Sequence, residues 1–142
     1  MNFKQRNKNS LNGLANELDE IANINTINDI LTVIVSHHKI GVRSMFSFGV
    51  GQDLKNVNKN VCYLGQSGIG LPNKDYYFND NKKSVLEAYR NHVSKGFEIL
   101  GMSTEEARAA SKNTLEIEIQ LAKSMLSPAE LRVPENTYNI ML

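Results

Sequence analysis

The apolar residues of this chain recur at spacings of three and four over most of its length, which is the period of an amphipathic helix. The longest single stripe consists of Val85, Leu86, Tyr89, Val93, Phe97 and Leu100. Gly101 follows at the position typical of a helix C-terminus, and Ser103 with Glu106 forms the capping-box pattern that begins another helix. The same spacing occurs in residues 11–21 and 27–34. These segments predict a mainly α fold.

One short region departs from the helical period and predicts a β-hairpin. From Met45 onward, aromatic and aliphatic residues alternate with serine and glycine, and a second alternating run surrounds Tyr63. Alternation with period two is typical of a strand that has one packed face. The polar segment 53–60 lies between the two runs and favours a loop. We therefore expect a mainly α fold with one small β-hairpin at about residues 45–65, in a single domain of residues 1–142.

Composition and charge exclude several classes of function. Sixteen basic and fifteen acidic side chains give a formal net charge of +1, so the chain lacks the clustered positive charge that nucleic-acid binding needs. The excess of Lys4, Arg6 and Lys8 at the start is interpreted as a solvated terminus. Cys62 is the only cysteine, so no disulfide can form within the chain. The longest apolar run, residues 30–35, is too short to span a bilayer, and we expect no membrane contact by this segment.

The residues that commonly carry catalysis or bind metals are few and unfavourably spaced. His37 and His38 are adjacent, so they point about 100° apart on a helix and cannot both face one metal ion. Neither they nor His92 begins an H-E-x-x-H string, the pattern that pairs two zinc ligands with a general base. The glycines of residues 65–70 fit a turn better than a phosphate-binding loop. Glu118 falls on the apolar side of its helix and therefore requires a cationic partner or several hydrogen bonds.

Two stretches of the sequence carry a resemblance to a known family. The first is Met45–Asp53 with Tyr63–Gln66 and the string Gly68-Ile-Gly-Leu-Pro-Asn-Lys-Asp-Tyr-Tyr77. The second consists of Glu118, Leu121-Ala122, Leu126–Arg132 and Thr137-Tyr138-Asn139 before Met141. In this order and spacing they resemble the N-terminal region of neprilysin-family zinc metallopeptidases, closest to the bacterial, endothelin-converting-enzyme-like members. The likeness covers about residues 14–142, with Ile69 and Lys74 in place of the usual Leu and Arg.

The resemblance implies two largely helical lobes around a closed cavity, one of which carries an H-E-x-x-H zinc site and hydrolyses peptides. This chain matches a stretch of the other, capping lobe, so we expect a non-catalytic helical lobe fragment that supplies scaffold and cavity wall. The resemblance implies zinc in the full-length parent, and no cofactor, metal ligand or catalytic residue in this chain. The matching residues are interpreted as structural: Gln66, Gly70, Leu71, Pro72, Asp75, Tyr76, Tyr77, Glu118, Arg132, Tyr138 and Asn139. An alternative for the loop from Gln66 to Tyr77 is that it lines the interface between the lobes.

The same resemblance suggests the partners and the location of the parent. The partners are the catalytic lobe of the parent peptidase and, for the parent, its peptide substrates. The parent is expected to be exported in a bacterium, to the periplasm, the cell surface or the medium, with any signal upstream of Met1 because residues 1–10 are polar. The alternative is a free-standing helical protein-interaction module without enzymatic activity. An H-E-x-x-H string downstream of Leu142 distinguishes the first reading from the second.

Three further expectations concern the chain on its own. It should neither bind zinc tightly nor cleave peptides, since a catalytic zinc needs three protein ligands. It should fold, yet expose an apolar patch where the rest of the enzyme docks. Glu118 should pair with Arg132, which one tight turn brings back toward it, because arginine meets a carboxylate with two parallel hydrogen bonds.

Overall fold

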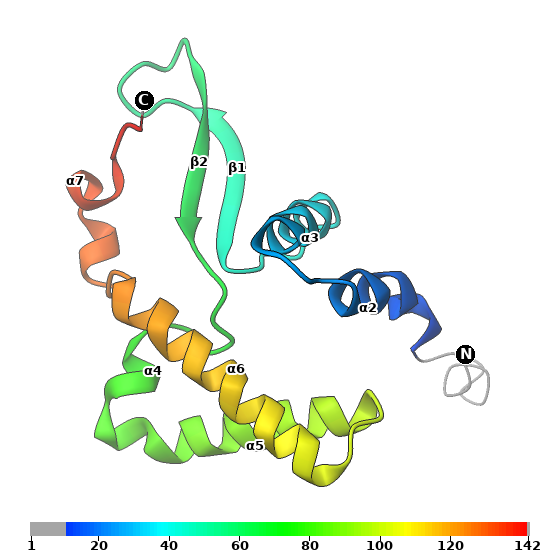
Figure 1. Ribbon diagram of the computed structural model, residues 1–142. Helices are drawn as coiled ribbons and strands as arrows, with labels where there is room; N and C mark the ends of the chain where they lie inside the picture. The colour runs from blue at the N-terminus through cyan, green and yellow to red at the C-terminus, as the bar shows by residue number, and fades with distance from the viewer. Residues whose placement is uncertain (1–10, 142) are drawn as a thin grey trace, which may run out of the picture. The chain divides into compact units, whose positions relative to one another are not determined.

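The computed structural model describes residues 11–141, so the basic residues Lys4, Arg6 and Lys8 lie outside the described part of the chain. Helices make up most of it, and one two-stranded antiparallel sheet interrupts them (Figure 1). The α-helices and the 3-10 helices, which are labelled η, are η1 (Asn12–Leu14), α2 (Ala15–Ala22), α3 (Ile27–Lys39), α4 (Asp75–Phe78), η2 (Asp80–Lys82), α5 (Lys83–Ile99), α6 (Thr104–Ser124), η3 (Glu130–Arg132) and α7 (Pro134–Thr137). The strands are β1 (Phe46–Gln52) and β2 (Asn60–Gln66). The prediction of a mainly α fold with one hairpin at about residues 45–65 is confirmed.

The chain divides into two compact units, residues 1–44 and 45–142. Helices α2 and α3 belong to the first unit, and the hairpin with the remaining helices belongs to the second. All the residues that carry the family resemblance lie in the second unit, apart from its weaker beginning near residue 14. That residues 1–142 form one domain of a larger protein stays a prediction.

In the first unit, α3 begins at a capping box. The Thr26 hydroxyl accepts a hydrogen bond from the backbone N–H of Asp29, and the Asp29 carboxylate accepts one from the N–H of Thr26. These bonds satisfy N–H groups that have no partner inside the helix. Ser36 donates a hydrogen bond of 3.2 Å to Glu20, which joins α3 to α2.

In the second unit, β1 and β2 pair with Phe48 opposite Leu64 and Val50 opposite Cys62. Opposite residues of an antiparallel pair share a face, so these four side chains lie together on one face of the hairpin. Phe48, Val50 and Leu64 are 54%, 67% and 59% exposed, and Cys62 is exposed as well. The prediction that the apolar face of this strand is packed is therefore wrong within residues 11–141, because these side chains meet solvent.

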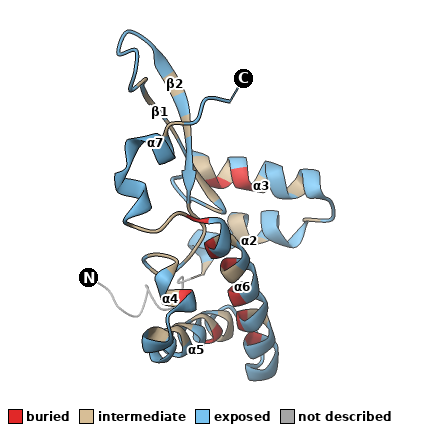
Figure 2. Ribbon diagram, turned by 90° about the vertical axis from the view of Figure 1, so that its left-hand side faces the viewer, coloured by how far each residue is buried: buried red, intermediate tan, exposed pale blue. Residues whose placement is uncertain are grey.

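Helices α5 and α6 are joined by a short turn and pack against one another (Figure 1). α5 ends just before Gly101, whose φ of +100° suits glycine because it lacks a Cβ. Ser103 begins α6 as predicted: its hydroxyl accepts a hydrogen bond from the N–H of Glu106, whose carboxylate accepts one from the N–H of Ser103. The buried face of α6, red in Figure 2, recurs at spacings of three and four and consists of Ala107, Ser111, Leu115, Glu118 and Ala122. This face positions Glu118 toward the interior of the second unit.

Short elements complete the second unit. Asp75 begins the single-turn helix α4. Ser127 and Glu130 exchange a pair of hydrogen bonds ahead of η3, from the Ser127 N–H to the carboxylate at 2.7 Å and from the Glu130 N–H to the hydroxyl at 3.3 Å. None of the helices in residues 11–141 combines the length and the apolar character needed to cross a membrane.

Candidate functional site

Glu118 lies on the buried face of α6 and is only 8% exposed. Its two carboxylate oxygens accept hydrogen bonds from two tyrosine hydroxyls, that of Tyr77 in α4 at 2.6 Å and that of Tyr89 in α5 at 2.8 Å. Both donors are neutral, so hydrogen bonds rather than a cation compensate the burial of this carboxylate. The three side chains, which we call the Glu118 network, connect α4, α5 and α6.

The predicted pairing of Glu118 with Arg132 is wrong. No ion pair among the described residues joins the two, and Arg132 is exposed in η3. Each oxygen of the Glu118 carboxylate accepts a tyrosine hydroxyl instead. The sequence indicated that this carboxylate needs either a cation or several hydrogen bonds, and the structure contains the hydrogen bonds.

The network raises the pKa of both tyrosines above the ordinary value. Burial disfavours the ionised form of Tyr77, and the hydrogen bond that its hydroxyl donates to Glu118 raises the pKa further because that bond needs the proton. Burial and the bond to Glu118 raise the pKa of Tyr89 for the same reasons. Both hydroxyls therefore remain donors to Glu118 at pH values where a free tyrosine, with a pKa of about 10, ionises.

The loop that leads into α4 fits closely against this network. The backbone N–H of Leu71 donates to the Tyr77 hydroxyl at 3.1 Å, so that hydroxyl both accepts and donates a hydrogen bond. A Cβ at Gly70 would lie 1.9 Å from the hydroxyl oxygen of Tyr89, far inside van der Waals contact. Gly70 is thus the residue type that leaves room for Tyr89 to reach Glu118.

Two longer side chains fasten the same loop to the C-terminal end of α6. The Gln66 amide donates to the carbonyl of Leu126 at 3.2 Å and accepts from the N–H of Leu126 at 2.9 Å. Lys74 donates to the carbonyl of Met125 at 2.7 Å. A single ammonium donor suffices for that carbonyl, so lysine makes this contact without the planar fork of arginine. The loop from Gln66 to Tyr77 is therefore held at Gln66 and Lys74 against the segment just after α6, and at Tyr77 against Glu118 of α6.

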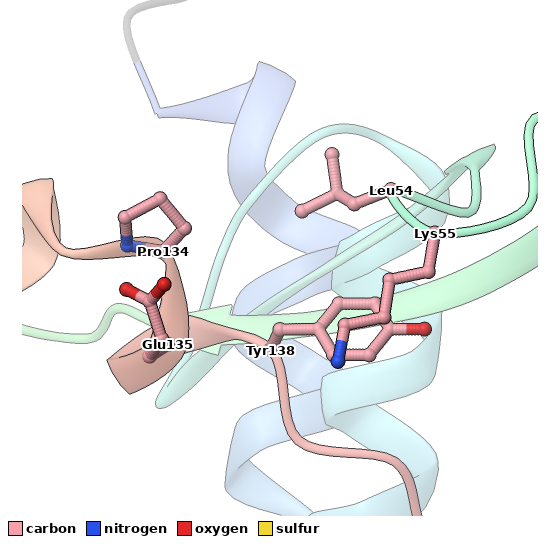
Figure 3. Close-up of a pocket in the computed structure, with 5 residues that line it drawn as sticks. All are labelled: Leu54, Lys55, Pro134, Glu135 and Tyr138. Atoms are coloured by element: carbon pink, nitrogen blue, oxygen red, sulfur yellow. The ribbon is translucent and has the colours of Figure 1, made fainter.

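A second polar contact joins the segment after α7 to the hairpin loop. The Tyr138 hydroxyl donates to the Asp53 carboxylate at 2.9 Å, and the Lys55 ammonium lies 4.4 Å from the centroid of the Tyr138 ring. Hydrogen bonds from the Lys55 N–H and the Tyr138 hydroxyl hold the pKa of Asp53 below its usual value. Figure 3 shows Lys55 and Tyr138 at an open pocket of about 340 Å³, which is also lined by Leu54, Pro134 and Glu135. These contacts fix the C-terminal segment against the hairpin loop.

The other residues singled out in the sequence make local contacts. Asp75 is the first residue of α4. The ring of Tyr76 lies beneath Lys82, whose ammonium is 3.6 Å from the ring centroid. The Asn139 amide donates to the carbonyl of Asn136 at 3.3 Å. Pro72 and Arg132 are both exposed.

The structure thus brings together only part of the set that the sequence singled out: Gln66, Gly70, Leu71, Tyr77 and Glu118. Tyr89 belongs with them and was missed. One signal pointed to it, because a tyrosine within an apolar helical stripe needs a partner for its hydroxyl. Matching that requirement to the unpaired acceptor expected at Glu118 identifies the contact.

The chemistry open to the Glu118 network follows from its hydrogen bonds. Both carboxylate oxygens and both tyrosine protons are used within the network, which therefore cross-links three helices and a loop. Within residues 11–141, no group of three or more His, Cys, Asp or Glu side chains is arranged to hold a metal ion.

The fold of this chain recurs in a solved metallopeptidase. The zinc metalloprotease Zmp1 of Mycobacterium tuberculosis in its open state matches with a TM-score of 0.88, over 94% of this chain and 21% of that one. The complex of that enzyme with an inhibitor matches with a TM-score of 0.86, over 91% of this chain and 20% of that one. At 23% and 24% sequence identity, this likeness shows the fold alone. The fold of this chain is thus that of one part of this zinc metalloprotease.

The sequence defines the family more narrowly: the model of peptidase family M13 matches residues 1–142, and the chain belongs to this family. Endothelin-converting enzyme 1 of Cavia porcellus is 37% identical over 114 residues, which are 78% of this chain and 15% of that enzyme. Neprilysin-3 of Drosophila melanogaster is 31% identical over 112 residues, which are 78% of this chain and 14% of that protein. The resemblance to neprilysin-family metallopeptidases is confirmed, and the chain spans about 15% of the length of these curated relatives.

Proposed function

We propose that this chain is a non-catalytic segment of a zinc-dependent metalloendopeptidase that hydrolyses peptides, and that it supplies scaffold and part of the cavity wall. Membership of peptidase family M13 supports the class of the parent. The small share of the relatives' length that the chain spans supports its being one portion of a larger enzyme. The zinc ion and the residues that cleave peptides belong, on this proposal, to the rest of the parent.

The Glu118 network is the observation that carries the structural role. The polar groups of Glu118, Tyr77 and Tyr89 face one another, and each is hydrogen-bonded within the same unit. A side chain that acts on a substrate needs a free donor, acceptor or lone pair toward it. The hydroxyl protons of Tyr77 and Tyr89 are directed to Glu118, and these bonds hold α4, α5 and α6 together.

For the loop from Gln66 to Tyr77 we propose the same role. Its three polar anchors bond to Glu118 of α6 and to Met125 and Leu126 just after that helix. This arrangement favours scaffold over the alternative of a loop that lines the interface between lobes. We also propose, from the resemblance to bacterial members, that the parent is exported from the cell.

The test compares the chain of residues 1–142 with the full-length parent, both purified without affinity metals. We expect about one zinc per molecule and chelator-sensitive cleavage of a fluorogenic peptide in the parent, with neither in the short chain. Stoichiometric zinc at sub-micromolar affinity with chelator-sensitive peptidase activity in the short chain contradicts the non-catalytic role. A parent gene that encodes no H-E-x-x-H string after residue 142 contradicts the proposal of a peptidase and favours the alternative of a helical protein-interaction module.

A further inference from the structure

The hairpin presents an apolar surface that is largely exposed, although Cys62 and Leu64 line an open pocket with residues 137–141 of the same unit. Phe48 with Leu64 and Val50 with Cys62 form two cross-strand pairs on one side of the sheet, which we call the hairpin face. The side chains of Phe48, Val50 and Leu64 are each more than half exposed. Large apolar side chains grouped in this way on a soluble surface mark a site of association.

The composition of both strands shows that this surface is built for burial. Neither β1, with the sequence FSFGVGQ, nor β2, with the sequence NVCYLGQ, contains a charged residue. In a two-stranded sheet each strand also has a free edge. Natural proteins protect such exposed edges with charges, prolines or bulges, and an edge without them aggregates unless another segment covers it. The charged residues of this region lie in the loop at the tip, at Asp53, Lys55 and Lys59.

We propose that the hairpin face is the docking surface for the remainder of the parent peptidase, which packs an apolar surface of its own against Phe48, Val50 and Leu64. This inference rests on the proposed function. Most of the length of the curated relatives lies outside the segment that this chain matches, so the occupant is available within one polypeptide. The strand face that the alternating pattern predicts to be packed is then buried against the rest of the parent enzyme.

Cys62 provides a built-in reporter, because it is the only cysteine of this chain and it lies on the hairpin face. The experiment treats the chain of residues 1–142 and the full-length parent with iodoacetamide and follows alkylation of the Cys62 peptide by mass spectrometry. We expect the thiol to react freely in the short chain and at least about 100-fold more slowly in the native parent, where reaction requires local opening. The parent unfolded in denaturant gives the intrinsic rate for the same peptide. Equal rates in the native parent and the short chain, or protection already present in the short chain, overturn the proposal.

A substitution tests the same surface without the thiol. Phe48→Asp in the parent should lower the yield of folded enzyme several-fold, whereas Val57→Asp, at a residue of the hairpin loop that is 65% exposed, should not. Equal yields of the two variants contradict the docking role. If the parent is a dimer in light scattering and Phe48→Asp converts it to a folded monomer, the occupant is a second copy and the proposal is wrong.

The two proposals fail separately. A parent that contains no zinc and cleaves no peptide, yet protects Cys62, refutes the peptidase function and leaves the docking surface in place. A parent that is an active zinc peptidase but leaves Cys62 as reactive as in the short chain refutes the docking surface alone.

Discussion

The Glu118 network and the hairpin face lie in the same unit and are opposite in character. In the network every buried polar group has a hydrogen-bond partner from the same unit. Gly70 leaves room for one of these partners, the Tyr89 hydroxyl. On the hairpin face, apolar side chains that the strand pattern assigns to a packed interior are more than half exposed. The comparison shows that one compact unit can satisfy its buried polar groups in one region and leave apolar side chains exposed in another. Substitutions should therefore affect the isolated chain through the network and the parent through both regions.

The largest effect on the isolated chain should come from Glu118→Ala. The change leaves the buried hydroxyls of Tyr77 and Tyr89 without their acceptor, and we expect the free energy of unfolding to fall by about 3 kcal/mol. Glu116→Ala is the matched control on the same helix, since its side chain is 62% exposed and its contact with Lys112 is a distant ion pair of 3.9 Å. The control should change stability by less than about 0.5 kcal/mol. Urea denaturation measures both, and equal effects would mean that Glu118 is not held as described.

Gly70→Ala should follow with a loss of about 1–3 kcal/mol. The added methyl group meets the Tyr89 hydroxyl, which must move and weaken its bond to Glu118. Gly96→Ala is the control, because nothing lies within 4 Å of a Cβ at that position in α5. Alanine favours a helix interior over glycine, so the control should gain up to about 1 kcal/mol. Thermal melting that shifts in the same direction for both variants contradicts the close fit at Gly70.

Alkaline pH should weaken the network next. The pKa values of Tyr77 and Tyr89 are raised in the folded chain, so the unfolded chain loses these protons first. The stability that the two hydroxyls contribute is fully present below the unfolded pKa of about 10 and is lost as pH rises through the folded values. The free energy of unfolding should therefore decline above about pH 10, and less steeply in Tyr77→Phe. Denaturation curves from pH 8 to 11 measure how steeply the free energy of unfolding falls with pH. An identical slope in the variant would show that folding does not raise the pKa of Tyr77.

The smallest effect on the isolated chain is expected on the hairpin face. Phe48→Asp replaces a side chain that already meets solvent, so it should cost about 1 kcal/mol or less, mainly through strand propensity. A loss as large as that of Glu118→Ala would show that the face is packed within the isolated chain, and the contrast between the two regions would disappear.

The sequence predicted local structure well because local structure depends on nearby residues. The helix stripes, the hairpin and the capping box at Ser103 involve residues at most four positions apart or on adjacent strands. Glu118 shows where this information ends. Its burial followed from the helical period, but its partners lie 41 and 29 residues away in sequence.

Arg132 was chosen as the partner because it is charged and near in sequence, and spacing alone cannot rank it against two distant tyrosines. The prediction that the apolar face of the hairpin is packed failed for a related reason. Its pattern reports that Phe48 and Val50 are suited to burial, but not which segment buries them, and residues 11–141 contain no segment that does so.

The central claim is that the family-like residues of this chain act through stability and not through chemistry. Glu118→Gln in the full-length parent tests it most directly, with the melting temperature and kcat/KM per zinc-loaded molecule measured on the same preparation well below the melting point. We expect the melting temperature to fall by several degrees, since glutamine cannot accept both tyrosine hydroxyls, while kcat/KM stays within about twofold. An unchanged melting temperature with kcat/KM reduced about 100-fold or more would contradict the account, because Glu118 would then stabilise the transition state rather than the fold.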